Sequence, residues 1–416
     1  MNPIFAAAFL CLLINPLPGA PVRVSLKPGP GEGRSLIRDG KPYFVKGAGG
    51  TTRLADLAAR GANSLRTWST EDLGRILDEA ASLHLTVSAG IWLEPECDWF
   101  SYRKPEDCAK QAERVLNEVL KFRNHPALLA WGLGNEAEGD GANADFWKQL
   151  DRLAVRAKEA DPEHPVFTAV AGMNRAKAQG MNEHTPHLDF VGINTYGGIF
   201  SLRKSLPEMG WTRPWLLTEW GPQGFWERPK RPWGAALEQT GTEKAGMMDR
   251  AYKEVIAPGG DCLGSYAFIW GWKLEGSATW FSLLTDTGET TASVDVLGRH
   301  WSGSPPVNTA PDTGDLQNVP AAEIVPRATF TATLSARDAE NDPLTWRWAV
   351  LPEPGNHDAG RPQPMPAAVP GTVGSPASPE KVTVTAPEQP GYYRLHVWIT
   401  DGKGHTGTAS APFAVK

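Results

Sequence analysis

The stretch ALLAWGLGNE, residues 127–136, is nearly all apolar and ends in Asn135 and Glu136. An uninterrupted apolar run of this length is typical of a strand buried on both faces of a parallel sheet. Seven other runs of the same kind occur, at residues 43–49, 64–68, 85–93, 165–171, 190–197, 214–221 and 263–272. Several of the segments between them place apolar residues three and four positions apart, which indicates amphipathic helices. Eight strands that alternate with helices predict a (β/α)8 TIM barrel; a doubly wound sheet is the alternative, and the count of eight favours closure.

The segments on either side of the predicted barrel differ from it in composition. Residues 4–14 are apolar and are followed by small residues, which predicts a signal peptide over residues 1–20 and a secreted or periplasmic protein; an ordinary buried segment is the alternative. Residues 21–302 then hold an N-terminal hairpin and the barrel. Residues 303–314 are rich in Pro, Gly, Ser and Thr, as linkers are. Residues 315–416 alternate like half-buried strands and predict a small all-β, immunoglobulin-like sandwich.

The composition limits the classes of partner and cofactor. The chain has 416 residues, a net charge of −6 and no basic field that would attract nucleic acid. No segment after the N-terminal one is long and apolar enough to span a membrane. No spacing of Cys and His indicates zinc, and we expect neither a metal nor an organic cofactor in the active site. The sequence leaves the oligomeric state open.

The cysteines and one acidic cluster each have two interpretations. Cys97 and Cys108 flank a polar loop and could form a disulfide in an oxidising compartment. Cys262 begins an apolar run and is expected to be a buried free thiol. The acidic residues within 338–342, together with Asp401, offer hard oxygen ligands for calcium, but an acidic turn without an ion is the favoured interpretation.

The end of the opening stretch also has two interpretations. Gly132, Gly134 and Ala137 match the G-x-G-x-x-A spacing of a dinucleotide-binding turn. That interpretation requires a helix to begin at once, with its amides facing a pyrophosphate. Here acidic residues follow instead, and the helical pattern begins only near Ala144. We therefore interpret Glu136 as a catalytic carboxylate at the end of the fourth strand.

A second carboxylate occupies a matching position. Glu219, within PWLLTEWGP, lies at the end of the seventh predicted strand. The carboxyl ends of all barrel strands meet at one rim, where the active sites of such barrels lie. Cleavage of a glycosidic bond uses two carboxyl groups, one to protonate the departing oxygen and one to attack the anomeric carbon or to activate water. Glu136 and Glu219 together therefore indicate glycoside chemistry.

Four segments resemble a known enzyme family. They are GNE at residues 134–136, TEWG at 218–221, DGKPYFVKGAGG at 39–50 and NHPALLAWGLGNE at 124–136. They are similar to the clan A retaining glycoside hydrolases, and most of all to the catalytic barrel of family 2. The resemblance covers roughly residues 35–300, and the tail is loosely similar to bacterial immunoglobulin-like modules.

The resemblance implies a role for each matching residue. Glu136 would be the general acid/base and Glu219 the nucleophile. Asn135 would bind the sugar hydroxyl next to the anomeric centre, and Arg66 and Tyr196 would contact the nucleophile. Trp270 would lie under the reacting sugar. Apart from the resemblance, three tryptophans that follow the nucleophile are candidates for stacking on sugars: Trp220, Trp226 and Trp233.

The chain departs from family 2 in one respect. Enzymes of that family usually carry a sugar-binding sandwich and an immunoglobulin-like domain before the barrel, and these often wall the substrate pocket. Only about 20 residues separate the predicted signal peptide from the first strand here. The sequence therefore predicts a retaining β-glycoside hydrolase with an open cleft, acting on a β-linked glucan or a related polysaccharide. A transglycosylase with the same glutamates, and a non-catalytic carbohydrate-binding barrel, are the alternatives.

Overall fold

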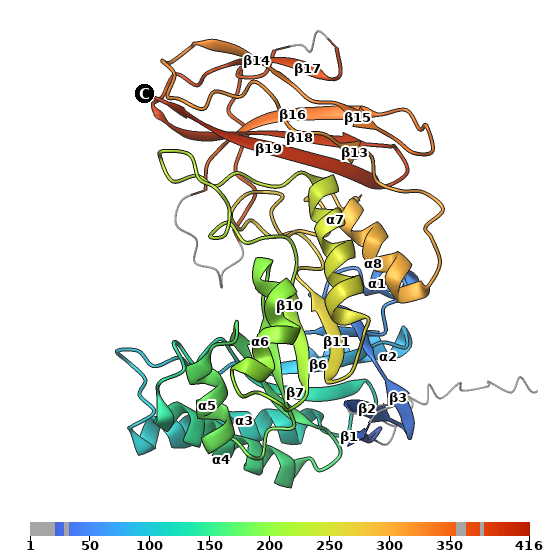
Figure 1. Cartoon of the computed structure of the whole chain (residues 1–416), viewed down its shortest axis with the longest axis vertical. Coiled ribbons are helices and arrows are strands. Elements are labelled where there is room, and N and C mark those ends of the chain that lie inside the picture. Colours follow the sequence, from blue (N-terminus) through green and yellow to red (C-terminus); the bar gives the residue numbers. More distant parts are fainter. Residues whose placement is uncertain (1–20, 29–32, 355–362, 375–377) are drawn as a thin grey trace, which may run out of the picture.

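Figure 1 shows the computed structural model of the chain, which describes residues 21–28, 33–354, 363–374 and 378–416. A barrel forms the lower part of the molecule in this view, and β-sheets formed by the C-terminal residues lie above it. The predicted signal peptide falls on residues 1–20, outside the described residues, so it stays a prediction.

Eight parallel strands close into a barrel in the order β10-β11-β4-β5-β6-β7-β8-β9. Each of the eight apolar runs overlaps one of them, so the predicted TIM barrel is confirmed and the doubly wound alternative is wrong. The strands are β4 (Val45–Gly49), β5 (Ser64–Arg66), β6 (Thr86–Ile91), β7 (Leu128–Asn135), β8 (Val166–Ala171), β9 (Phe190–Asn194), β10 (Trp215–Trp220) and β11 (Cys262–Ala267).

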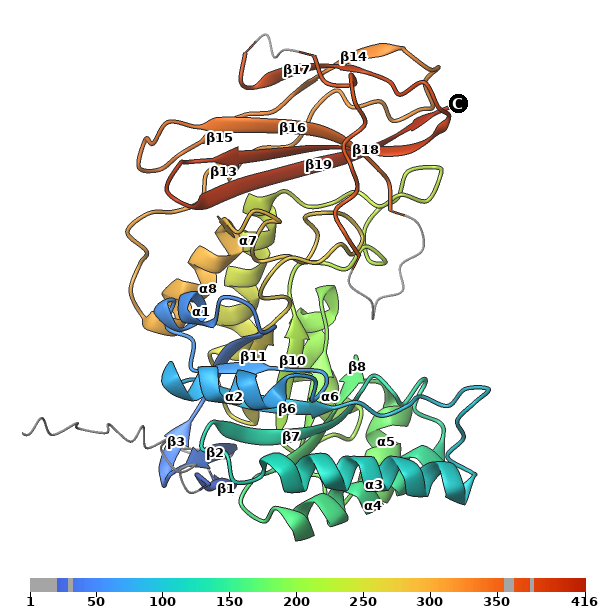
Figure 2. The same ribbon diagram turned by 180° about the vertical axis from the view of Figure 1, so that it is seen from behind.

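Helices connect the strands and cover the outside of the barrel (Figures 1 and 2). They are α1 (Leu54–Ala59), α2 (Leu73–Ser82), α3 (Pro105–Phe122), α4 (Ala144–Ala160), α5 (Arg175–His184), α6 (Leu202–Glu208), α7 (Gly241–Ala251) and α8 (Ala292–Ser302), with a 3-10 turn at Gly197–Ser201 and a π-helical turn at Tyr252–Ile256. The start of α4 follows from its cap, because the Asn143 side chain accepts hydrogen bonds from the amides of Asp145 and Phe146. Residues 137–143 therefore form a loop at the rim.

The hairpin that precedes the barrel covers its amino-terminal end. Strands β1 (Val24–Pro28), β2 (Arg34–Arg38) and β3 (Lys41–Tyr43) form an antiparallel sheet. Val24 and Leu36 are buried in one cluster with Leu129, Phe167 and other side chains from the first residues of the barrel strands. The opposite, carboxyl-terminal rim is left for the loops that form the pocket.

The C-terminal part of the chain is all-β, as predicted. A four-stranded sheet has the order β12-β19-β18-β16, and two-stranded sheets pair β13 with β15 and β14 with β17. The strands are β12 (Thr290–Thr291), β13 (Asp312–Thr313), β14 (Thr329–Thr333), β15 (Ala336–Arg337), β16 (Thr345–Pro352), β17 (Lys381–Thr385), β18 (Gly391–Thr400) and β19 (His405–Val415). Val350, Val397 and Phe413 belong to a hydrophobic core of this part. Its immunoglobulin-like topology stays a prediction.

This tail is joined to the barrel by a buried charged cluster. Arg394 of β18 is fully buried and pairs with Glu353, and its guanidinium lies 3.8 Å from the carboxylate of Glu238 in the loop after β10. Glu238 also binds Lys244 of α7. Burial alone would raise the pKa of Glu238, but Lys244 and Arg394 together hold it at about 2. The cluster therefore fixes the tail against the loop that follows the predicted nucleophile.

One prediction about the cysteines is wrong and one is confirmed. Cys97, Cys108 and Cys262 are all free, so the disulfide considered between Cys97 and Cys108 is absent. Cys108 lies on α3, where its thiol is directed to the backbone oxygen of Tyr102 at 3.4 Å, whereas Cys97 lies in the preceding loop. Cys262 is buried, as predicted, and burial raises the pKa of its thiol to about 12. Among the described residues, no helix has the length and apolar character needed to cross a membrane.

Candidate active site

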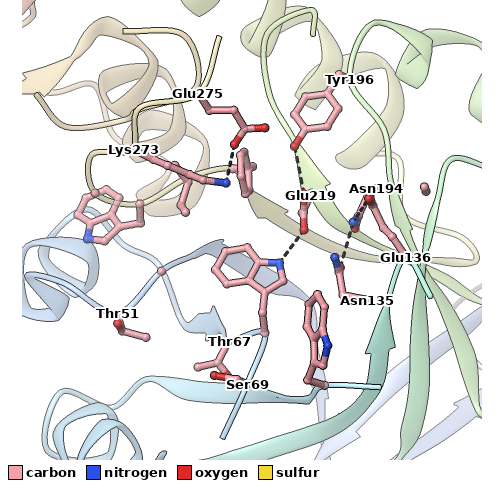
Figure 3. Close-up of a pocket in the computed structure, with 18 of the residues that line it drawn as sticks. Thr51, Thr67, Ser69, Asn135, Glu136, Asn194, Tyr196, Glu219, Lys273 and Glu275 are labelled. Carbon is pink, nitrogen blue, oxygen red and sulfur yellow. Dashed lines mark hydrogen bonds and ion pairs between the residues drawn. The ribbon is translucent and has the colours of Figure 1, made fainter. Parts of the chain in front are cut away.

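A cavity of about 1210 Å³ opens at the carboxyl-terminal rim of the barrel. Its wall includes residues from the ends of β5, β7, β9, β10 and β11 and from the loops that follow them. Gln363 of the tail also lines it. Both predicted catalytic residues, Glu136 and Glu219, belong to the wall, and Figure 3 shows their side chains in the same pocket.

Glu219 is held by donors on both carboxylate oxygens. Arg66 donates to Oε1 at 3.1 Å, and Tyr196 donates to Oε2 at 3.1 Å. Burial raises the pKa of the Tyr196 phenol well above its usual value, and the Glu219 carboxylate raises it further, so the phenol stays a neutral donor. Burial lowers the pKa of Arg66, but this is opposed by Glu219. The two donors fix the orientation of the Glu219 carboxylate, as a nucleophile requires.

The surroundings of Glu136 raise the pKa of its carboxyl group. Burial raises the pKa of its carboxyl group, and the negative charge of Glu219 raises it further, whereas a hydrogen bond from Asn194 lowers it. The net direction is upward, which favours the protonated form needed by a general acid. The direction of this pKa shift suits Glu136 to the role of the acid.

The backbone conformation of Glu136 is also unusual. Its φ of 53° lies in the left-handed region, which costs a non-glycine residue about 1–2 kcal/mol. The pairing of β7 with β8 shifts in register between Gly132 and Asn135, and the Glu136 amide then donates to the oxygen of Ala169 at 2.8 Å. This irregular strand end turns the carboxylate into the pocket, and strain of this kind is often found at functional sites.

Asn135 links the two glutamates. Its side-chain oxygen accepts hydrogen bonds from Arg66 at 2.6 Å and from Asn194 at 3.1 Å. Arg66 in turn contacts Glu219, and Asn194 contacts Glu136 at 2.7 Å. Because the oxygen of Asn135 is engaged by two donors, its amide nitrogen is the group available to bind a substrate hydroxyl.

Only some of the tryptophans expected to contact sugars lie in the pocket. Trp270 lines it, with its indole nitrogen donating to the oxygen of Thr52, and so does Trp226, which is half exposed. The prediction for Trp220 is wrong: its ring is fully buried between β10 and the helical layer, 6.3 Å from Tyr252. Successive side chains of a strand point to opposite faces, so a pocket-facing Glu219 turns Trp220 outward. Trp233 stacks on Tyr392 of the tail instead.

Two residues that contact the glutamates are not predicted from the sequence. The indole nitrogen of Trp68 donates to Oε1 of Glu219 at 2.7 Å, and Asn194 donates to Glu136. Both lie at or just beyond strand ends, in SLRTW and GINTYG, and this position is the signal that could have identified them. Gly49 makes room for Trp68, because a Cβ there would come within 2.6 Å of its ring.

We expect Trp68→Phe to lower kcat about 10- to 100-fold, since it removes a hydrogen bond to a charged group but keeps an aromatic ring. KM should change little, because the lost contact positions the nucleophile rather than the substrate. Steady-state kinetics on an aryl glycoside will measure the change. Trp272→Phe is the matched control: this indole also lines the pocket but donates to the backbone oxygen of Ala278. Equal kinetics in the two variants would show that Trp68 does not position Glu219.

The phosphate-binding interpretation of the opening stretch does not fit the structure. Gly132 and Gly134 lie within β7, and the next helix, α4, begins only at Ala144. The intervening loop contains Glu138, which is buried and paired with Lys177 at 2.7 Å. Among the described residues, the pocket contains no group of three carboxylate, His or Cys side chains close enough together to hold a metal.

Comparison with known proteins agrees with this geometry. Residues 75–224, which include both glutamates, match the TIM barrel domain of glycosyl hydrolases family 2. This part of the chain is therefore similar to the barrel of that family. The β-galacturonidase of this family from Eisenbergiella tayi matches 68% of the chain with a TM-score of 0.54 at 14% identity, and at that identity the likeness concerns the fold alone.

Two curated relatives each match part of the chain. The probable mannan endo-1,4-β-mannosidase F of Aspergillus oryzae is 22% identical over 207 residues, which is 42% of this chain and 43% of the relative. β-Galactosidase 2 of Enterobacter cloacae is 32% identical over 109 residues, 26% of this chain and 10% of the relative. The chain thus spans less than half the length of these relatives.

Proposed function

We propose that the protein is a retaining β-glycoside hydrolase, with Glu219 as nucleophile and Glu136 as general acid/base. The supporting observation is the pair of glutamates in one cavity, one bound by Arg66 and Tyr196 and the other with a pKa raised by burial and by its partner's charge. A family 2 barrel is consistent with this chemistry.

In the first step a covalent sugar–enzyme bond forms. The carboxylate of Glu219 attacks the anomeric carbon while Glu136 gives its proton to the departing glycosidic oxygen, and the glycosidic bond breaks. The Asn135 amide donates to the hydroxyl next to the anomeric carbon, where a hydrogen bond that strengthens in the transition state lowers the barrier. The products are the free leaving group and an ester between the sugar and Glu219.

The second step restores the enzyme. Once Glu219 is esterified, it no longer carries the negative charge that raises the pKa of Glu136. Glu136 then loses its proton more readily and can act as a base. It takes a proton from water as the water oxygen attacks the anomeric carbon, and the ester bond breaks with the electron pair returning to Glu219. Two inversions leave the anomeric configuration unchanged.

For the substrate, we propose a β-linked glucan or a related β-linked polysaccharide. The cavity of about 1210 Å³ exceeds the roughly 300–1,000 Å³ of pockets for drug-sized ligands. Trp92 and Trp226 line it with 40% and 51% of their surfaces exposed, and such flat faces suit stacking on further sugar units. A mannan-degrading enzyme among the relatives supports a polysaccharide.

We also propose that the enzyme acts outside the cytoplasm. The proposal rests on the apolar stretch within residues 1–20 and the small residues that follow it. An immunoglobulin-like tail would suit a secreted polysaccharide hydrolase either as a binding module or as a spacer.

Proton NMR of the first sugar released will test this function. We expect a panel of β-glucans and β-mannans to include a substrate whose β-anomer appears first and then mutarotates. α-Linked chains of the same sugars are the control and should not be cleaved. Initial release of the α-anomer would contradict the retaining mechanism, and binding of a β-glycan without any cleavage on long incubation would favour the non-catalytic alternative.

A further inference from the structure

Three carboxylates gather in the tail, away from the catalytic pocket. Asp338 and Asp342 lie in the turn between β15 and β16, and Asp401 follows β18. One ligand oxygen from each lies within 4.8 Å of the other two. Asp338 is 5% exposed and Asp401 is 2% exposed, so most of this negative charge is out of contact with bulk water.

Two of the carboxylate oxygens in this cluster have no partner among the described residues. Oδ2 of Asp338 and Oδ2 of Asp342 are both buried and accept no hydrogen bond there. A buried polar atom without a partner destabilises the folded state, and more so when it carries charge. Two unpartnered oxygens on carboxylates that approach one another this closely indicate that a cation belongs between these residues.

The other oxygens of the cluster are already held. Oδ1 of Asp338 accepts from the amide of Asp342, and Oδ1 of Asp401 accepts from the amides of Lys403 and His405. The Lys403 ammonium lies 3.2 Å from Oδ1 of Asp342. One lysine leaves the three carboxylates with an excess of negative charge, while the backbone amides fix their positions. The cluster therefore has the rigidity and charge of a cation site.

We propose that Asp338, Asp342 and Asp401 bind one calcium ion. The ligands are all carboxylate oxygens, which suits a hard cation and not zinc or copper. Oxygens on opposite sides of one ion lie at about twice the metal–oxygen distance, roughly 4.6–5.2 Å for calcium and roughly 4.0–4.2 Å for magnesium. The three oxygens lie within 4.8 Å of one another, so they can share one ion of the size of calcium. Water and nearby carbonyl groups would complete its shell.

The site lies where the tail meets the barrel. Asn308, in the stretch that follows α8, donates to Oδ2 of Asp401 at 2.6 Å, and Thr309 donates to Glu340 of the same acidic turn. His405 lies 3.3 Å from Asp295 of α8. Figure 1 shows the connecting stretch running from α8 to β13 beside these strands. A calcium ion there would tie the connection, the acidic turn and the β18–β19 turn together.

Calorimetric titration of the full chain, freed of metal with EGTA, will test the site. We expect one calcium ion per chain with a Kd of about 10⁻⁴ M or tighter, and at least tenfold weaker binding of magnesium. The melting temperature should rise with calcium concentration. Amide exchange at residues 308–310 and 401–405 should slow when calcium binds, which locates the ion.

Asp338→Asn should weaken calcium binding at least tenfold and abolish the dependence of melting temperature on calcium. Asp342→Asn, at a partly exposed position, is a second variant in case Asp338→Asn does not fold. Asp315→Asn, which removes the same charge from an exposed position, should bind as the unaltered protein does. Absence of calcium binding to the unaltered protein, or unchanged binding in Asp342→Asn, would overturn the proposal.

Discussion

Replacing Glu219 by glutamine should lower kcat by about 10⁴-fold or more, because an amide cannot form the covalent bond to the anomeric carbon. The fold should be preserved, since glutamine has nearly the same shape and its one side-chain oxygen can still accept from Arg66 or from Tyr196, although not from both. The measurement is the rate of release of an aryl leaving group, together with circular dichroism. Mass spectrometry after rapid quenching should show a sugar–enzyme adduct in the unaltered protein and none in Glu219→Gln.

Glu71→Gln is the matched control for this variant. Glu71 lines the same cavity but is exposed, and its backbone amide contacts Ser69 rather than Glu136 or Glu219. We expect its kcat to stay within a few-fold of normal. If Glu219→Gln were as active as Glu71→Gln, Glu219 would not be the nucleophile, and the proposed double displacement would be refuted.

Glu136→Ala should affect substrates according to their leaving groups. A poor leaving group depends on protonation, so kcat/KM for an unactivated glycoside should fall about 10²- to 10⁴-fold. A strongly activated aryl glycoside needs no proton in the first step, and the glycosyl-enzyme should then accumulate because no base activates water. Azide requires no base, so it should accelerate turnover and yield the β-glycosyl azide, which chromatography and NMR can identify.

The pH profile provides a second measurement on the same residue. In the unaltered protein, loss of the proton from Glu136 ends its service as an acid, so kcat/KM should decline as pH rises through a pKa above the usual carboxyl value. In Glu136→Ala, this basic limb should disappear for the activated substrate. A basic limb that persists unchanged, or a failure of azide to form a glycosyl azide, would assign the acid/base role to another group.

Hydrolysis and transglycosylation share these residues and differ only in the acceptor. Water and a sugar hydroxyl compete for the glycosyl-enzyme, and Glu136 would deprotonate either. Trp92 and Trp226 line the pocket with partly exposed rings, and this exposed part of the pocket is compatible with both acceptors. Product analysis at rising concentrations of an added oligosaccharide separates them, because a transglycosylase would yield longer chains at the expense of free sugar.

The two glutamates of the site are predictable from their positions at the ends of barrel strands. Glu136 and Glu219 were predicted as neighbours although 83 positions separate them in the chain (219 − 136 = 83), because both end strands of one barrel. The structure places both in one pocket, where Arg66 and Tyr196 bind Glu219 and Asn135 accepts a hydrogen bond from Arg66. The reasoning missed Trp68, whose contact with Glu219 depends on the path of the loop after β5.

The amino-acid sequence by itself determined the alternation of strands and helices and the residues that end each strand. These follow from the local order of apolar, polar and capping residues, which a short window contains. Only the tertiary structure decided that Trp226 faces the cavity while Trp220 is buried, and that Cys97 and Cys108 stay apart. It also left buried oxygens of Asp338 and Asp342, beside Asp401, without a partner among the described residues. The directions of these side chains depend on strand register and on the packing of loops from distant parts of the chain, which no short window contains.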